Sequence, residues 1–285
     1  MSTEILVPSR GPLDAVAAWG SLAAHTITGL DHLDPEAGAL TRLLTGPAGP
    51  VPVTLTPRPD GIALRTPAAD PAVLEDLQAQ VRRWFDLDAD LAPIDAHLSR
   101  SPVLAAQVAG RPGLRITRYP DPFEAVVLIV LGQQVSLAAG RLFGSRLLAA
   151  HGEGTAATPV GPLRRFPRPG ALARVDPEQL RDELGLTRSR TRTVLATAAL
   201  FADLPDRAPT SEELAAVPGI GPWTLACAAI RAGSDTDAFP ASDAVLKRAM
   251  VAAGAGEDPA VVESWRPWRS YAAVRLWAGS GAHPA

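Results

Sequence analysis

The segment that most constrains the fold is a short turn, rich in proline and glycine, between two helix-like stretches. It reads Val-Pro-Gly-Ile-Gly-Pro-Trp-Thr over residues 217–224. Gly219 and Gly221 allow backbone angles closed to other residues and let a ligand approach the main chain closely. Pro222 suits the first turn of a helix, where its missing N–H costs nothing. The sequence therefore predicts a helical hairpin whose free amides form a phosphate-sized anion site.

An aspartate, Asp243, follows Thr224 by 19 residues, at the end of the sequence Phe-Pro-Ala-Ser-Asp. One interpretation is structural, because Ser242 or Asp243 can cap the helix that follows, and the helix dipole stabilises a carboxylate there. The other is functional, because a carboxylate at this distance after a phosphate-binding hairpin faces the sugar of a bound strand. Taken alone, the residues leave both interpretations open.

Composition restricts the class of protein. The chain has 285 residues, 47% of them hydrophobic, which is enough for one large domain or two ordinary ones. The single cysteine, Cys227, excludes an internal disulfide framework or a cysteine-ligated cluster, and five scattered histidines disfavour a transition-metal site. Residues 1–10 lack a secretory pattern and no apolar run approaches the length of a membrane span, so we expect a cytoplasmic protein without a membrane partner.

The residue pattern changes near residue 92. Before it, β-like runs at 51–56 and 62–65 flank a turn, and an apolar helical face follows at 70–85. After it the pattern is helical, with one helix expected over 95–109 and a proline-rich connector over 158–169. Residues 1–100 hold 7 basic and 13 acidic side chains, against 20 and 17 in residues 101–285. We therefore predict an α+β chain with an antiparallel N-terminal domain, 1–92, and an all-α region, 93–285, with two subdomains around a cleft.

Several segments together resemble the helix-hairpin-helix (HhH-GPD) superfamily of base-excision DNA glycosylases, and within it the AlkA-type 3-methyladenine DNA glycosylases. The resemblance rests on the hairpin with Asp243 and on five further segments: Arg83–Asp88, Phe123–Ala125, Leu131–Ser136, Leu184–Ala196 and Trp268–Ala272 with Trp277. It covers residues 80–280, and before residue 80 only the general pattern matches. It implies a mostly α-helical glycosylase core preceded by a smaller TBP-like antiparallel α/β domain.

The resemblance also implies the chemistry. Such enzymes flip a damaged base out of the duplex and hydrolyse its bond to the sugar. Asp243 matches the carboxylate that stabilises the cation-like sugar of the transition state. Trp223 and Trp277 match the pocket tryptophans, whose electron-rich faces attract cationic alkylated purines of the 3-methyladenine or 7-methylguanine type. Cys227 and Ala244 stand in the pocket where relatives have further aromatic residues.

The DNA contacts implied by the resemblance come from the hairpin, from a polar wedge and from one arginine: Gly219, Gly221, Thr224, Gln134 and Arg248. A structural monovalent cation is implied at three main-chain carbonyls of the hairpin: Ala215, Val217 and Ile220. No cofactor is required for the reaction.

Position 223 separates two reaction types within the family. Bifunctional relatives carry a lysine there that attacks the sugar, whereas this chain has Trp223, and its one lysine is Lys247. We therefore expect a monofunctional enzyme. We also expect it to act in base excision repair as a monomer, on damaged double-stranded DNA in the nucleoid. Fewer pocket aromatics leave open a glycosylase for oxidised, deaminated or mismatched bases. The hairpin alone would also suit a non-catalytic helix-hairpin-helix DNA-binding protein.

Overall fold

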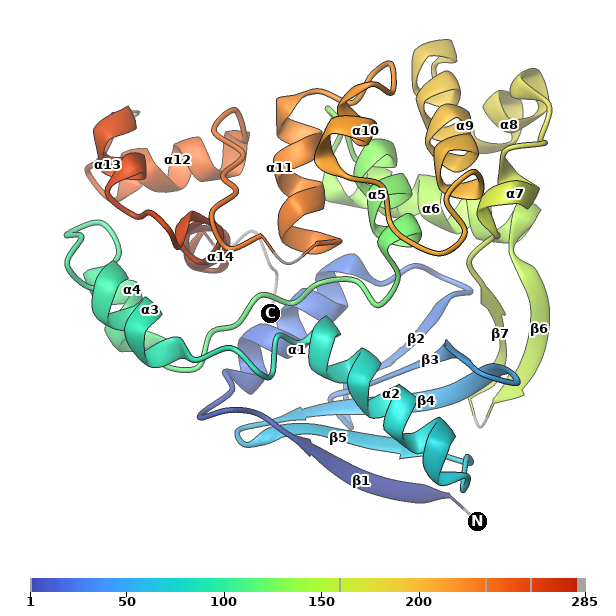
Figure 1. The fold of residues 1–285 in the computed structure, drawn as a ribbon, viewed down its shortest axis with the longest axis horizontal. Coiled ribbons are helices and arrows are strands. Elements are labelled where there is room, and N and C mark those ends of the chain that lie inside the picture. The colour runs from blue at the N-terminus through green and yellow to red at the C-terminus, as the bar shows by residue number, and fades with distance from the viewer. Residues whose placement is uncertain (1, 159, 234, 257, 281–285) are drawn as a thin grey trace.

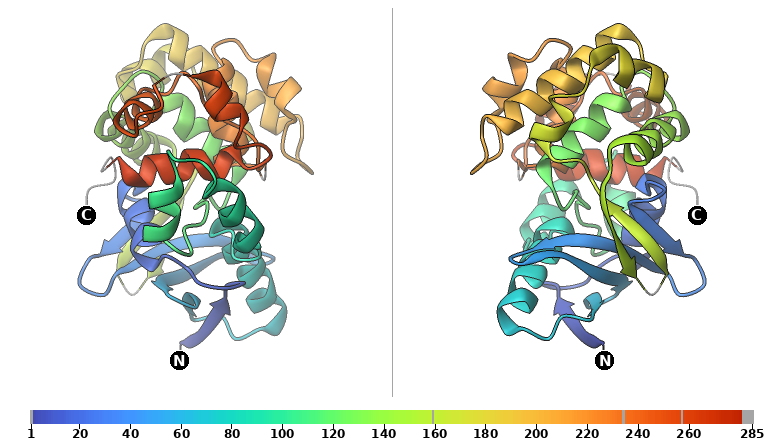
Figure 2. Two further views of the ribbon diagram at one scale, coloured as in Figure 1. Left: turned by 90° about the vertical axis from the view of Figure 1, so that its left-hand side faces the viewer. Right: turned by 90° about the vertical axis from the view of Figure 1, so that its right-hand side faces the viewer.

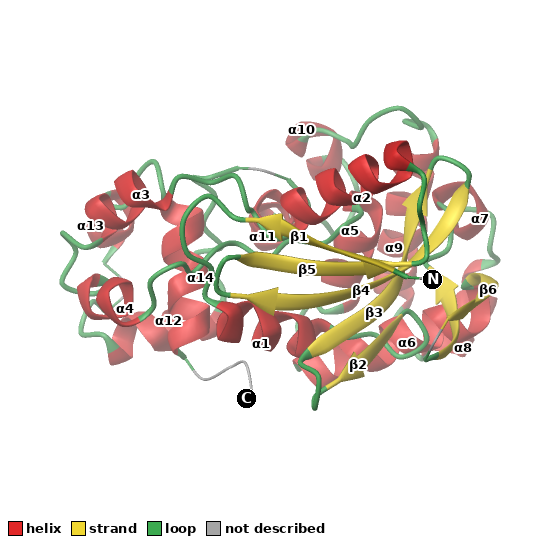
Figure 3. Ribbon diagram, turned by 90° about the horizontal axis from the view of Figure 1, so that it is seen from below, coloured by secondary structure: helices red, strands yellow, loops and turns green. Residues whose placement is uncertain are grey.

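The N-terminal part of the chain is an antiparallel sheet. A computed structural model describes residues 2–158, 160–233, 235–256 and 258–280. Five strands follow one another across the sheet in the order β1-β5-β4-β3-β2, seen side by side in Figure 3. Their bounds are β1 Thr3–Pro8, β2 Asp31–Asp34, β3 Ala39–Gly46, β4 Gly49–Arg58 and β5 Gly61–Thr66. Helix α1 (Ala15–His25) packs on β4, and α2 (Pro71–Trp84) packs on β1 and β3 (Figure 1).

The register in which the strands pair explains the apolar core on one face of this sheet. Leu64 of β5 lies opposite both Ile5 of β1 and Leu55 of β4, and Leu55 and Leu64 are completely buried. Because side chains alternate across a strand, this pairing places whole rows of apolar residues on the helix-covered face. The two strands and the helix predicted over 51–56, 62–65 and 70–85 are confirmed as β4, β5 and α2.

Helices make up most of the remainder (Figure 1). Their bounds are α3 Leu91–Leu98, α4 Ala105–Gly110, α5 Pro122–Leu131, α6 Leu137–His151, α7 Pro169–Leu172, α8 Pro177–Leu184, α9 Arg188–Ala202, α10 Ser211–Ala215, α11 Pro222–Arg231, α12 Ala244–Ala252, α13 Pro259–Glu263 and α14 Arg269–Gly279. A membrane-spanning helix needs about 20 apolar residues. None of the helices in the described ranges is long and apolar enough to cross a membrane.

The helices surround two apolar cores. One core lies among α5–α11 and includes Val127, Leu184 and Val194. The other joins segments far apart in the sequence, because Leu98 of α3 and Leu104, just before α4, pack with residues of α12 and α14. Figure 2 shows α3 and α4 beside the C-terminal helices. The boundary predicted between residues 92 and 93 falls inside α3, which belongs to this second core.

Two local predictions were wrong. The single helix expected over 95–109 is two helices, α3 and α4, separated by a turn that contains Pro102. The first helix ends at Leu98, and because proline disfavours helical angles in the residue before it, Pro102 prevents a single helix from running through Ser101. The expected connector over 158–169 contains strand β7 (Gly161–Arg165), which pairs with β6 (Glu153–Thr158) in an antiparallel hairpin and begins at Gly161 with φ 107°. Its prolines masked the strand pattern, and the hairpin contacts β3 and β4. Residues 93–285 are therefore not all-α as predicted, because this two-stranded sheet lies among their helices.

A buried ion pair joins the sheet to the helical part. Arg42 of β3 donates from Nη2 to Glu124 Oε2 of α5 at 2.7 Å, and its Nη1 lies 3.5 Å from Asp31 Oδ1. All three side chains are almost completely buried. Burial raises the pKa of Glu124 to about 7, and the neighbouring Arg42 opposes that rise. Since a buried charge without its partner is costly, this contact fixes α5 relative to the sheet.

Candidate active site

The predicted hairpin is present between α10 and α11. Thr210 and Glu213 form a capping box that begins α10. Gly219 has φ +92°, and a Cβ there would lie 2.1 Å from Thr193 Oγ1, so both conformation and space require glycine. Gly221 differs, because its φ of −101° is ordinary and a Cβ would meet nothing within 4 Å. Gly221 therefore lies at the open side of the turn, at the start of α11.

Asp243 is held by four N–H groups. It caps α12, with Oδ1 accepting from the backbone N–H of Val245 at 3.0 Å and of Leu246 at 2.9 Å. Trp223 of α11 donates its indole N–H to Oδ2 at 2.9 Å, and Trp277 of α14 donates its own to Oδ1 at 3.2 Å. A carboxylate only accepts hydrogen bonds, so four donors match it. The structural and the functional interpretations of this aspartate are thus compatible.

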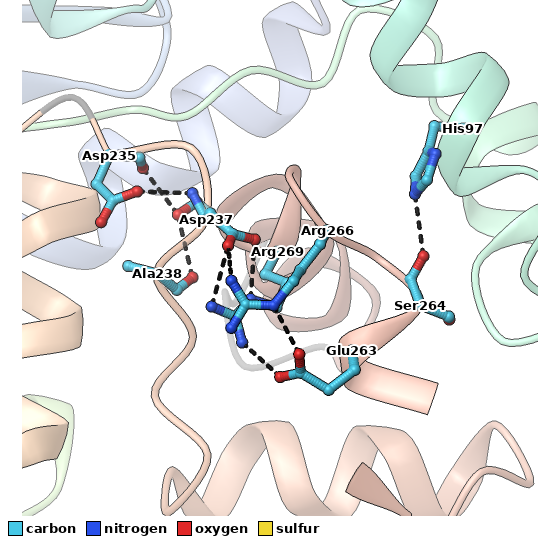
Figure 4. A network of polar contacts seen from close by, with 9 residues as sticks. His97, Asp235, Asp237, Ala238, Glu263, Ser264, Arg266 and Arg269 are labelled. Atoms are coloured by element: carbon cyan, nitrogen blue, oxygen red, sulfur yellow. Dashed lines mark hydrogen bonds and ion pairs between the residues drawn. The ribbon is translucent and has the colours of Figure 1, made fainter. Parts of the chain in front are cut away.

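A polar network fixes the segment before Asp243 to the helix that carries Trp277 (Figure 4). Asp237 accepts from Arg269 Nε at 2.8 Å and pairs with Arg266, and Glu263 accepts from both arginines. Ser270 Oγ donates to the Asp235 carbonyl at 2.8 Å. Exposed ion pairs are weak individually, but a network of several is stronger. The arrangement sets the start of α14 relative to the loop that leads into α12.

A cavity of about 280 Å³ opens beside Asp243. This volume is close to the lower end of small-molecule sites. Three of the predicted pocket residues, Trp223, Trp277 and Cys227, line it together with Asp243. The fourth, Ala244, is exposed and is not among the lining residues, whereas its neighbour Val245 is. The predicted pocket is therefore assembled from α11, α12 and α14, except at Ala244.

The cavity also has polar lining residues that the sequence did not reveal: His25, Tyr119, Arg141 and Arg231. Arg231 lies with its guanidinium carbon 5.2 Å from the centre of the Trp277 ring, and its Nη1 donates to the Thr117 carbonyl. A signal for Arg231 did exist, because it follows Trp223 and Cys227 at intervals of four on one helix face. His25 and Tyr119 carried no such local signal, since distant parts of the chain bring them to the site.

Cys227 is a neutral wall residue. Burial, together with the nearby Asp243 carboxylate, raises the pKa of its thiol to about 12. The reactive form of cysteine is the thiolate, which a raised pKa disfavours. The side chain is 6% exposed and therefore contributes apolar surface to the cavity.

The predicted DNA-contacting residues fall into two groups. Gln134, in the α5–α6 turn, and Arg248, on α12, are exposed. Thr224 is only 2% exposed, and its Oγ1 accepts a hydrogen bond from Gln133 Nε2 at 2.8 Å. Thr224 therefore supports the hairpin from inside, which does not fit the phosphate contact expected of its hydroxyl.

The monovalent-cation site expected at the hairpin consists of three main-chain carbonyls. Main-chain carbonyls coordinate such ions, and the turn presents those of Ala215, Val217 and Ile220 within one hairpin. The carbonyl of Val217 also accepts from the N–H of Ile220 at 3.0 Å, which keeps the turn tight. Within the described ranges, no group of three or more His, Cys, Asp or Glu side chains forms a metal site.

Comparisons with known proteins show the family of this chain. The AlkA N-terminal domain family matches residues 4–121, and the family of HhH-GPD superfamily base excision DNA repair proteins matches residues 127–263. DNA-3-methyladenine glycosylase 2 of Escherichia coli K12 is 33% identical over 222 residues, covering 75% of each chain. The chain belongs to the HhH-GPD superfamily.

Another superfamily member is longer than this chain. A probable bifunctional transcriptional activator/DNA repair enzyme AlkA of Mycobacterium tuberculosis is 37% identical over 287 residues, covering 97% of this chain. This chain spans only 57% of that relative's length. Among solved structures, 3-methyladenine DNA glycosylase from Archaeoglobus fulgidus superposes with a TM-score of 0.80, and 98% of each chain is covered at 16% identity. That likeness shows a shared fold, which confirms the predicted α+β class.

Proposed function

We propose that this protein is a DNA glycosylase that excises alkylated purines, such as 3-methyladenine and 7-methylguanine, from double-stranded DNA. The observation that carries the proposal is Asp243, held by two backbone and two indole N–H groups at the edge of a cavity of about 280 Å³. Relatives named as DNA-3-methyladenine glycosylases support it.

The geometry suggests how the reaction proceeds. A flipped base enters the cavity against Trp223 and Trp277, and its deoxyribose lies beside Asp243. As the glycosidic bond breaks, positive charge grows on the sugar, and a carboxylate already oriented by four donors stabilises it without reorganising. Water then attacks the sugar carbon and leaves an abasic site. Alkylated purines carry a positive charge, so they leave without a strong general acid.

The absence of a lyase step is part of the proposal. Trp223 occupies the position from which a lysine attacks the sugar in bifunctional relatives, and its indole N–H donates to Asp243. Two assays test this: borohydride, which would trap a Schiff base, and strand scission without alkali. A trapped adduct or alkali-free scission by the wild-type protein would contradict a monofunctional reaction.

The proposal is tested by single-turnover release of 7-methylguanine and 3-methyladenine from duplexes, followed by alkali to reveal abasic sites. Asp243→Asn should reduce the rate by about 10²- to 10³-fold, as loss of one preorganised electrostatic group does in other enzymes. Binding to undamaged duplex should persist. Release at the wild-type rate by Asp243→Asn would exclude the proposed role, and no release of any lesion by the wild type would exclude the activity.

A second candidate is a glycosylase for deaminated or oxidised bases. The observation that favours it is Arg231, since a guanidinium at the cavity repels a cationic base and suits a neutral one that presents oxygen acceptors. Hypoxanthine and 8-oxoguanine duplexes belong in the same assay. The third candidate is a non-catalytic DNA-binding protein. Binding alone would not require the two indole hydrogen bonds to Asp243.

The remaining elements of the proposal concern partners and ions. The proposed partner is DNA, and a monomer binds it. Such binding would associate the protein with the nucleoid. Light scattering with and without a short duplex tests the monomer. A monovalent cation at the carbonyls of Ala215, Val217 and Ile220 would bridge protein and phosphate, and tighter DNA binding in potassium than in choline chloride of equal ionic strength tests it.

A further inference from the structure

Gln133, in the turn between α5 and α6, is hydrogen-bonded to the hairpin. Its Nε2 donates to the Gly219 carbonyl at 2.9 Å and to Thr224 Oγ1 at 2.8 Å. A glutamine amide has two N–H groups, so both are used on the hairpin. The partner residues lie 86 and 91 positions further along the chain. One side chain thus links two segments that are distant in sequence.

The same turn is fixed on its other side. Arg190 of α9 donates from Nη2 to the Gln133 carbonyl, and Ser136 caps α6 by accepting from the N–H of Ala139 at 3.2 Å. The hairpin is itself attached to α9, because Thr193 Oγ1 donates to the Pro218 carbonyl at 2.8 Å. The α5–α6 turn, the hairpin and α9 therefore form a closed set of contacts.

Gln134 lies in the α5–α6 turn, next to Gln133, and its side chain is not used in these contacts. It is solvent-exposed and has φ +54°, a left-handed conformation that non-glycine residues adopt rarely. With Gln133 tied to the hairpin on one side and Ser136 capping α6 on the other, the side chain of Gln134 projects from a turn that is held at both ends.

We infer that Gln133 is a positioning residue, which couples the exposed Gln134 to the phosphate-binding hairpin so that both engage DNA at a fixed spacing. This inference rests on the proposed function. The hairpin binds the backbone while Gln134 fills the gap left by the flipped base. Loss of Gln133 should therefore make base flipping harder and leave hydrolysis of an already unstacked nucleotide unchanged.

The test uses Gln133→Met, which keeps the length of the side chain and removes its donors. Single-turnover release of 7-methylguanine is measured opposite cytosine and opposite a tetrahydrofuran abasic analogue, where flipping costs less. The variant should release the paired lesion at least about tenfold more slowly than wild type. It should release the unpaired lesion at a rate within about threefold of wild type. A structural defect would slow both equally.

Gln80→Met is the matched control. Gln80 Nε2 also donates to a carbonyl, that of Thr45 at 2.7 Å, and to a side-chain oxygen, Asp76 Oδ2 at 2.8 Å, but it lies on α2, away from the hairpin. It should leave the ratio of the two rates at the wild-type value. Because each ratio is measured on one preparation, it does not depend on the fraction of folded protein.

A binding measurement separates this inference from the proposed function. In a duplex with 2-aminopurine beside the abasic analogue, wild-type protein should raise the fluorescence by unstacking the probe, and Gln133→Met and Gln134→Ala should both reduce that rise. Equal losses on paired and unpaired lesions, or an unchanged fluorescence rise in Gln133→Met, would overturn the coupling. Absence of base release with the fluorescence pattern intact would overturn the glycosylase proposal and keep the coupling.

Discussion

The indole Nε1 of Trp223 lies 2.9 Å from Asp243 Oδ2, so a residue that lines the cavity is hydrogen-bonded to the carboxylate beside it. Trp277 makes the equivalent contact to Oδ1 at 3.2 Å. The two tryptophans therefore have two roles, since their faces line the cavity and their N–H groups orient Asp243.

The two roles can be separated with phenylalanine, which keeps an aromatic face and removes the donor. Trp223→Phe should slow base release by about 10- to 100-fold, because a hydrogen bond to a charged group contributes about 1.5–3 kcal/mol. Trp277→Phe, with the longer bond, should have a smaller effect. Single-turnover rates measure both, with thermal unfolding as the control. Wild-type rates in Trp223→Phe would show that the N–H does not orient Asp243.

The two hairpin glycines should respond differently to alanine. Gly219→Ala forces a Cβ into Thr193 at a positive φ, so we expect a loss of at least about 2 kcal/mol in the free energy of unfolding. Gly221→Ala should cost less than about 1 kcal/mol, since it only weakens a helix N-cap. Its effect should be on DNA affinity, where the added methyl group stands at the open side of the turn. Urea unfolding and duplex binding distinguish the two, and equal destabilisation would contradict the prediction.

Stability should depend on pH through Glu124. Its pKa is raised from 4.5 to about 7 in the folded protein by burial, so the folded state binds the proton more tightly than the unfolded state. The contribution of this group is therefore complete below pH 4.5 and is lost as pH rises to about 7. At about 1.4 kcal/mol per pKa unit, a rise from 4.5 to about 7 corresponds to a loss of at most about 3.5 kcal/mol.

Glu124→Gln isolates that contribution. The difference in unfolding free energy between wild type and variant, measured by urea at pH 5, 6, 7 and 8, should shift against the wild type between pH 5 and 7 and then level off. Asp31 stays in both proteins but interacts with Glu124 and shares Arg42 with it, so the difference reports the titration of the pair. A difference independent of pH would show that Glu124 titrates normally.

Cys227 should be unreactive in the native protein. Its thiol is buried and its pKa is raised to about 12, so iodoacetamide at pH 8 should modify it at least about tenfold more slowly than in urea-unfolded protein. Mass spectrometry gives a direct readout because the chain has one cysteine. Rapid labelling of the folded protein would mean that the cavity opens to solvent more than the structure indicates.

The hairpin and the carboxylate were predictable because their signals are local. The glycines, Pro222 and the cap sequence at Asp243 each specify a turn or a helix end within a few residues. The contact between Trp223 and Asp243 was not predictable in that way, because it depends on how α11, α12 and α14 pack.

Other features carried no readable local signal. Gln133 looks like an ordinary turn residue until the fold brings it to Gly219, and His25 reaches the cavity only through packing of α1 against the helical part. The β6–β7 hairpin was missed because its prolines resemble a linker. The DNA contact implied for Thr224 could not be checked from the sequence, because its burial and the contact of its hydroxyl with Gln133 depend on how the α5–α6 turn packs on the hairpin.

The lining of the cavity has a consequence for how the protein matures. In sequence order, its first lining residue is His25 and its last is Trp277, which lies on α14, the last helix of the described chain. Chains emerge from the ribosome from the N-terminus, and their domains fold in that order. The sheet and the hairpin can therefore form while synthesis continues, but Asp243 gains its second indole donor only after α14 has been made. A nascent chain that already carries the phosphate-binding turn would still lack a finished pocket, so DNA binding would precede catalytic competence during biosynthesis.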